Sequence, residues 1–283
     1  MWTLPLPDVE GAAEDLFTAL RENDVRALTS TNIEHDRVLE LYRHYDSIGG
    51  QPDASLKGED LRAELLSAIH DSYELTQKNR RLKKIREKLK LNIERCPYCG
   101  FGEVTELDHH IPKTNFKAHA IYTRNLIPCC HACNNIKGTT SEIQAEKQFF
   151  HAYLGQIPSE AFLKATILMT QLGFTASFSI ERTQQLNEDE FKRLTFQLNK
   201  LNLNERYTAT VATFLSTHKT AIEMMGAVGS EKLREFLLIS YEDSCKTFGA
   251  NHWQSALLLA LKESDEFCSG GYRCAFGNRD LPI

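Results

Sequence analysis

Hydrophobic residues recur at helical spacing over the first ninety residues of the chain. Apolar and aromatic side chains at 38, 41, 42 and 45 follow the i, i+3, i+4, i+7 pattern of one helix face, and the Gly-Gly-Gln-Pro sequence at 49–52 ends this helix. A second stripe predicts one long helix, or two helices with a kink between them, over residues 59–91. The two stripes consist of Val38, Leu41, Tyr42, Tyr45, Leu61, Leu65, Ile69, Tyr73, Leu75, Leu82, Ile85 and Leu89.

The helical period disappears between Cys96 and Gly138, where short alternating segments are separated by Pro, Gly and Asn. After this insert, residues 141–153 predict a helix, and residues 162–169 and 174–180 predict a pair of strands. Further apolar stripes predict helices in the remaining chain, at 191–201, 207–215, 233–241 and 256–261.

These patterns predict a mostly helical α+β protein. An N-terminal helical region, residues 1–91, precedes a small core at 92–156, and a mainly helical C-terminal region with the strand pair occupies 157–283. A length of 283 residues agrees with about two domains and with a sizeable apolar core.

The composition excludes a membrane-spanning protein. The longest uninterrupted apolar run, Ala256 to Leu261, has six residues, whereas a spanning helix needs about 20. The first ten residues lack the basic segment of a secretory signal, so we expect a cytoplasmic protein. In a reducing compartment, the eight cysteines favour metal ligands or free thiols over disulfides.

The charge is distributed unevenly along the chain. The formal net charge is −5, but residues 78–90 contain eight basic residues against Glu87 alone, a local charge of +7. Contact with a polyanion should therefore be local, and Arg81 and Lys84 are candidate nucleic-acid contacts within this run. A solvated helix face, or a docking surface for an acidic partner, is an equally good interpretation.

Two CxxC pairs predict a structural zinc site. Cys96 and Cys99 form the first pair, and Cys130 and Cys133 form the second, with thirty residues between the inner cysteines. Tetrahedral zinc binds four thiolates, and a CxxC turn presents both of its sulfurs to one ion.

The other cysteines do not have a metal-ligand spacing. Cys129 adjoins the second pair but would break its spacing, so it is expected to be a packed thiol. His131 lies between two ligand cysteines and is expected to be a bystander. Free thiols are expected at Cys245, Cys268 and Cys274.

Around these cysteines the sequence reads Leu107-Asp-His-His-Ile-Pro112, then Asn125-Leu-Ile-Pro128, and then Asn134-Asn-Ile-Lys-Gly138. At these residues the chain resembles the HNH, or ββα-metal, endonuclease family, whose pattern runs Asp-His-x-x-Pro, Asn-Leu and CxxC-Asn-x-x-Lys-Gly. The resemblance covers about forty-five residues and leaves most of the chain unexplained. It implies a ββα-metal core flanked by helical regions.

Phosphodiester hydrolysis explains why these residue types occur together. A neutral histidine can deprotonate water, and a hard divalent ion neutralises phosphoryl charge and stabilises the leaving alkoxide. His109, three residues before Pro112 as in the family pattern, is the expected general base. Asp108 and Asn134 offer oxygen ligands for Mg²⁺ or Mn²⁺, with Asn135 as a weaker alternative to Asn134.

The remaining motif residues are expected to support this chemistry. By resemblance, Asn125 fixes the loop that aims the base, although a loop asparagine that stabilises a turn predicts nearly the same geometry. His110 should point away from His109 and have a structural role. Lys113 and Lys137 are candidate phosphate contacts, and solvated surface lysines are the alternative.

The expected function is metal-dependent cleavage of nucleic acid, with DNA favoured. The run of Cys96-Pro-Tyr-Cys-Gly100, Leu107-Asp-His-His-Ile-Pro-Lys113 and Asn125-Leu-Ile-Pro-Cys-Cys130, with helical extensions on both sides, also resembles stand-alone bacterial HNH nucleases that accompany an ATPase in anti-phage systems of the Septu or retron-associated type. This resemblance implies an ATPase partner. The alternatives are a stand-alone restriction-type nuclease, an effector that cleaves RNA or tRNA, and a non-catalytic zinc module that only binds its partner.

Overall fold

The computed structural model describes residues 3–21, 30–170 and 173–276. The chain forms two compact units, one from Thr3 to Gln156 and one that begins at Ile157. It is mostly helical, with two small antiparallel sheets, which confirms the α+β prediction at this level. Among the described residues, no helix is both long and apolar enough to cross a membrane.

Helices form the first half of the N-terminal unit. They are α1 (Ala12–Arg21), α2 (Asn32–Ser47), the 3₁₀ helix η1 (Ala54–Lys57), α3 (Ala63–Asp71), the 3₁₀ helix η2 (Ser72–Thr76) and α4 (Lys83–Lys90). A capping box between Thr31 and Glu34 begins α2, and the four predicted stripe residues of this helix are all buried. The prediction of a helix ending before the glycine pair at 49–50 is confirmed.

Of the two predictions for residues 59–91, one long helix is wrong, whereas two helices are present as α3 and α4, separated by η2 and by turns at 77–82. The hydroxyls of Ser72 and Thr76 donate to the backbone carbonyls of Ala68 and Tyr73, and the chain tightens into η2. Asn79 then adopts a left-handed φ of 66°, which no helix interior allows. The basic run is therefore divided between a turn and the short helix α4.

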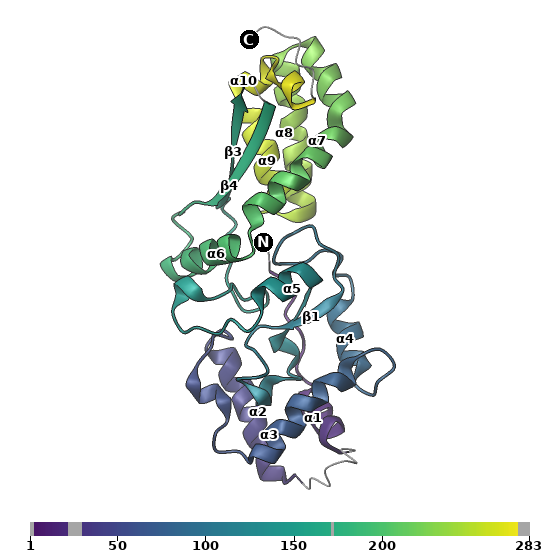
Figure 1. The fold of residues 1–283 in the computed structure, drawn as a ribbon, viewed down its shortest axis with the longest axis vertical. Coiled ribbons are helices and arrows are strands. Elements are labelled where there is room, and N and C mark those ends of the chain that lie inside the picture. Colours follow the sequence, from purple (N-terminus) through teal and green to yellow (C-terminus); the bar gives the residue numbers. More distant parts are fainter. Residues whose placement is uncertain (1–2, 22–29, 171–172, 277–283) are drawn as a thin grey trace. The chain divides into compact units, whose positions relative to one another are not determined.

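A small sheet and one helix form the centre of this unit. Strand β1 (Glu106–His109) pairs antiparallel with β2 (Leu126–Cys129), with Asp108 opposite Ile127. Helix α5 (His131–Lys137) follows β2 and lies against β1 (Figure 1). The two 3₁₀ helices η3 (Lys117–His119) and η4 (Thr123–Asn125) belong to the connection between the strands.

Residues 141–153 do not form the predicted helix. Only Ala145–Lys147 make a single 3₁₀ turn, η5. The side-chain amide of Gln148 donates to the carbonyls of Glu142 and Ile143, and every residue from 148 to 153 is buried. A helix that buries only one face cannot bury six consecutive residues, so the apolar period was misleading here.

The second unit contains the predicted strand pair, β3 (Leu163–Thr170) and β4 (Gly173–Ile180). Its helices are α6 (Glu188–Lys200), α7 (Leu203–Val228), α8 (Ser230–Phe248), α9 (Trp253–Glu263) and α10 (Asp265–Cys268), followed by the 3₁₀ helix η6 (Gly271–Phe276). Helix α9 packs on β3, and α7 packs on β4 (Figure 1). The strands and helices predicted for this part are confirmed.

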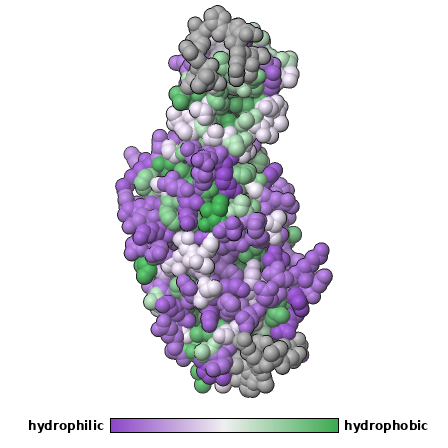
Figure 2. Space-filling model, in the orientation of Figure 1, coloured by the Kyte–Doolittle hydropathy of each residue, from purple (hydrophilic) through white to green (hydrophobic). Residues whose placement is uncertain are grey.

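Most of the surface of the N-terminal unit is hydrophilic on the face drawn in Figure 2, with hydrophobic side chains in small separate patches. The buried apolar side chains of this unit include those of α2, of the strands β1 and β2, and of the segment at 148–153. The four CxxC cysteines and Asp108 are buried among these side chains.

Candidate active site

The four cysteines of the two CxxC pairs converge. The sulfurs of Cys96, Cys99, Cys130 and Cys133 all lie within 4.8 Å of one another, and all four residues are buried. The Sγ atoms of Cys99 and Cys130 are 3.9 Å apart. Four thiolates around zinc at ~2.3 Å would have their sulfurs about 3.8 Å apart, so this donor set fits one structural zinc ion.

Glycines and a helix start shape the cysteine site. Gly100 adopts a left-handed φ of 83° in the first CxxC turn, and the carbonyl of Gly102 accepts from the backbone N–H of Cys96. A Cβ at Gly102 would lie 2.7 Å from the Cys130 sulfur, so only glycine fits there. Hydrogen bonds from Cys133 and the other two thiols hold the pKa of Cys130 well below its usual range, which favours a thiolate at the start of α5.

The remaining cysteines lie outside this cluster. Burial raises the pKa of Cys129, which keeps this thiol neutral and agrees with a packing role. Cys268 is buried, whereas Cys245 and Cys274 are partly exposed, and none of them forms a disulfide.

His109 is the last residue of β1, and its ring is held in one tautomer. Its Nε2 lies 2.9 Å from the carbonyl oxygen of Ala120. A carbonyl oxygen only accepts hydrogen bonds, so Nε2 carries the hydrogen and Nδ1 is left as the basic atom. Burial is the main cause that lowers the pKa of His109 to about 3, so the ring is neutral at pH 7.

The ring of Tyr73, from η2, packs edge-on against His109 with the ring centroids 4.4 Å apart. The Tyr73 hydroxyl donates to the carbonyl of Leu107 in β1. Lys113 places its ammonium 4.8 Å from the centre of the Tyr73 ring. After burial, the positive charge of Lys113 is one of the causes that lower the pKa of His109.

Asn125 connects the loop that follows His109 with the loop that carries its carbonyl partner. Its Oδ1 accepts the backbone N–H of Ile111 at 2.9 Å, and its Nδ2 donates to the carbonyls of Ile111 and His119. His119 directly precedes Ala120 in the chain. Fully buried, Asn125 therefore fixes both sides of the hydrogen bond that orients the His109 ring.

Two other side chains bind the carboxylate of Asp108. Its carboxylate accepts from the Tyr98 hydroxyl at 2.7 Å and pairs with the Lys137 ammonium at 3.0 Å. Burial raises the pKa of Asp108, and the charge of Lys137 offsets part of this effect. Lys137 also donates to the carbonyl of His109, and with 2% of its surface exposed it is not presented to solvent as a phosphate contact.

Asn134 does not turn towards Asp108. Its side chain lies 2.6 Å from a carboxylate oxygen of Glu106, whose other oxygen is 2.6 Å from Nδ1 of His131. The two predicted oxygen ligands thus have separate partners, and this arrangement does not fit a divalent ion held between them. Such an ion would have to displace the Lys137 ammonium from Asp108.

Sequence reasoning missed Glu106. It lies two residues before Asp108 on the same strand, and alternate residues of a strand share a face, so it faces α5 as Asp108 does. That spacing was the signal in the sequence. His131 is exposed and contacts Glu106, while Asn135 is exposed at the surface of α5.

His110 contributes to the core of the N-terminal unit. It is buried, and its ring lies 4.1 Å from the ring of His151, centroid to centroid. Its backbone N–H donates to the carbonyl of Asn125. The side chain thus helps to pack the segment at 148–153 against the centre of the unit.

The basic run is partly used for packing. Arg81 donates to the carbonyl of Ala19, and Arg86 and Lys90 both donate to the carbonyl of Thr105. Lys84 is exposed on α4 and can contact a partner, as can the exposed Lys78 and Arg80 before it.

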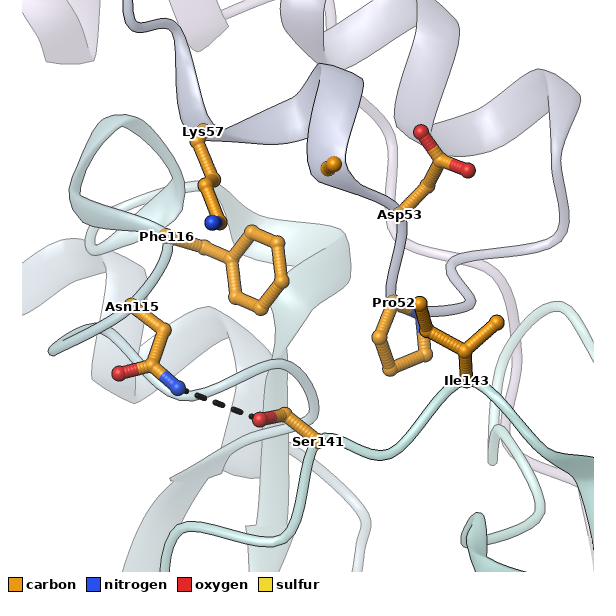
Figure 3. A pocket seen from close by; sticks show the side chains of 8 residues that line it. Pro52, Asp53, Lys57, Asn115, Phe116, Ser141 and Ile143 are labelled. Carbon is orange, nitrogen blue, oxygen red and sulfur yellow. Dashed lines mark hydrogen bonds between the residues drawn. The ribbon is translucent and has the colours of Figure 1, made fainter.

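A recess of about 540 Å³ lies where two segments leave the central motif. Asn115 and Phe116 follow the loop of Pro112, Ser141 follows α5, and the facing wall is η1 with Pro52 and Lys57 (Figure 3). The amide of Asn115 donates to the Ser141 hydroxyl and joins the two segments. Figure 3 shows the Phe116 ring directed towards Pro52 across the opening.

No model of a known protein family matches the chain, and neither the curated proteins nor the solved structures contain a significant match.

Proposed function

We propose that the protein is an endonuclease that hydrolyses phosphodiester bonds in nucleic acid, with His109 as the general base. The observation that carries this proposal is the ring of His109, which is neutral, tied at Nε2 to the carbonyl of Ala120, and basic at Nδ1. His109 differs from the buried His151, whose Nδ1 accepts two backbone N–H groups, because Nδ1 of His109 accepts no hydrogen bond among the described residues.

The reaction follows from this arrangement. Nδ1 of His109 removes a proton from water, the water oxygen attacks phosphorus, and the bond from phosphorus to the sugar 3′ oxygen breaks. The departing 3′ oxygen takes a proton from a second water molecule and becomes a hydroxyl. Lys113, beside Tyr73, supplies positive charge near the phosphate. Resemblance to HNH enzymes implies a 5′-phosphate and a 3′-hydroxyl as products.

The recess at Phe116 supports a nucleotide substrate. It offers the amide of Asn115 and the hydroxyl of Ser141, which are groups that suit the edge of a base, while the Phe116 ring itself is buried. Lys84 and the other exposed basic residues of the 78–90 run provide sequence-independent contacts with a backbone.

The test is cleavage by purified protein of supercoiled plasmid, single-stranded DNA and tRNA, with Mg²⁺, with Mn²⁺ and without added divalent ion. We expect His109→Ala to lose about 10²–10⁴-fold in rate while keeping its zinc and its circular dichroism spectrum. His131→Ala is the matched control, since this exposed histidine lies outside the base network. Equal rates for wild type and His109→Ala would remove His109 as the base.

The same assay separates the nuclease from a non-catalytic zinc module. Zinc-loaded wild type that binds nucleic acid but cleaves none of the three substrates favours the module. Preference among the substrates decides between the DNA nuclease and the effector acting on RNA.

We further propose that the nuclease is the effector of an anti-phage system and acts with an ATPase partner. A net charge of −5 gives the chain little attraction of its own to nucleic acid away from residues 78–90, so delivery by a partner would compensate. Recovery of a stoichiometric ATPase with the tagged protein from its native cells is the expected result, and cleavage at full rate by the isolated chain favours the stand-alone enzyme.

A further inference from the structure

A buried chain of hydrogen bonds reaches Asn125 from two distant parts of the sequence. Tyr45 belongs to α2, and His151 lies in the buried segment after η5. We infer that Tyr45 and His151 are positioning residues for His109, acting through Asn125. This inference rests on the proposed function, because positioning matters only if His109 acts on a substrate.

The direction of each hydrogen bond is fixed by its partners. Nδ1 of His151 accepts the backbone N–H groups of Tyr153 at 3.1 Å and Leu154 at 3.2 Å. The hydrogen of this ring is therefore on Nε2, 2.8 Å from the Tyr45 hydroxyl, and is donated to it. The hydroxyl hydrogen of Tyr45 is then free to be donated to Oδ1 of Asn125, 3.3 Å away.

This chain gives Asn125 a single orientation. Its Oδ1 receives the N–H of Ile111 and the hydroxyl of Tyr45, and its Nδ2 serves the carbonyls of Ile111 and His119. Without the Tyr45 hydroxyl, the only hydrogen bond left at Oδ1 is the one from Ile111, a residue of the loop that Asn125 positions. The tyrosine therefore anchors the amide to α2, an element outside both loops.

The backbone after α2 is shaped around the same pair of side chains. Gly50 has a left-handed φ of 72°, and a Cβ there would lie 2.3 Å from Cδ2 of His151 and 2.9 Å from Cζ of Tyr45. The glycine allows the helix end to close over the two rings. The N-terminal helical region is thus part of the site, because α2 supplies one of its supporting residues.

Tyr42 provides a matched control on the same helix. It is as well buried as Tyr45, and its ring stacks on Tyr122 with centroids 4.1 Å apart. Its hydroxyl has no hydrogen-bond partner among the described residues. Tyr45→Phe and Tyr42→Phe remove the same atom from similar packing, but only Tyr45→Phe breaks the chain to Asn125.

We expect Tyr45→Phe to lower kcat about tenfold to a hundredfold with KM changed less than about twofold, because the base is misaimed while substrate binding is kept. Tyr42→Phe should leave both constants unchanged. His151→Leu should match Tyr45→Phe, and His151→Gln, whose amide can donate to Tyr45, should recover part of kcat. Equal losses in Tyr45→Phe and Tyr42→Phe would assign the effect to packing and overturn the inference.

Nitrogen-15 NMR of the His109 ring gives a second measurement that needs no catalysis. The wild type and Tyr42→Phe should show only the form with hydrogen on Nε2, whereas Tyr45→Phe and His151→Leu should show a mixture of both tautomers. A tautomer unchanged in Tyr45→Phe and His151→Leu overturns the inference even if the enzyme is inactive. Absence of cleavage by wild type with the expected NMR change instead refutes only the proposed function.

Discussion

Three buried neutral histidines make the stability of the N-terminal unit sensitive to mild acid. Burial lowers the pKa of His109 and His151 to about 3 and the pKa of His119 to about 4, from an ordinary value of 6.5. Protonated His151 would direct a new N–H at two backbone donors, and protonated His119 would bury an N–H that has no partner among the described residues.

The sign and the size of the effect follow from linkage. Below pH 6.5 the unfolded chain binds protons that the folded chain refuses, so the free energy of unfolding falls as the pH is lowered towards the folded pKa values. For each histidine the loss between pH 6.5 and pH 5.5 is about 1 kcal/mol, and for the three together about 3 kcal/mol. Carboxylates titrate mainly below this window, so they contribute little to it.

Urea unfolding at pH 6.5, 6.0 and 5.5, followed by circular dichroism with zinc content checked at each pH, measures the slope. His119→Gln and His151→Gln should each remove about one third of the pH dependence, whatever they do to stability at pH 7. A free energy of unfolding that is flat across this window, or a slope that both variants retain in full, would refute the argument.

Three further changes have defined consequences. Cys96→Ser should lower the zinc content, measured by atomic absorption, from about one ion per chain to near zero. It should also unfold the centre of the N-terminal unit, as measured by circular dichroism. A variant that retains its zinc contradicts the four-thiolate site. Lys137→Met should lower the free energy of unfolding, measured in urea, by about 3–5 kcal/mol because it leaves the Asp108 carboxylate buried without its cation. In the double variant with Asp108→Asn this loss should be smaller, whereas additive losses from the two substitutions argue against the ion pair. Gly50→Ala should lower the free energy of unfolding by about 1–3 kcal/mol and should also lower activity, since the added methyl group would overlap His151. An unchanged melting temperature would show that the rings of His151 and Tyr45 move to accommodate the methyl group.

Local pattern was sufficient for most helices and for the cysteine cluster. The stripe on α2, the strand pair β3–β4 and the helices of the second unit were predicted because their periods arise from one buried face. The CxxC pairs were predicted because ligand spacing is a local property of the turn. The sequence did not decide between one helix and two at 59–91, because side chains there bond to the nearby backbone, and the helix predicted at 141–153 is absent because consecutive residues are all buried.

Only the tertiary structure shows which residues of the candidate site form hydrogen bonds and ion pairs with one another. The sequence predicts His109 as a general base but does not show that the carbonyl of Ala120 fixes its tautomer, or that Lys137 is buried against Asp108. Nor does spacing bring Tyr45 within 2.8 Å of His151, 106 residues away along the chain. Residue type and spacing determine which ligands and bases the chain possesses. Hydrogen-bond direction and burial depend on partners far apart in sequence, so only the folded chain assigns them.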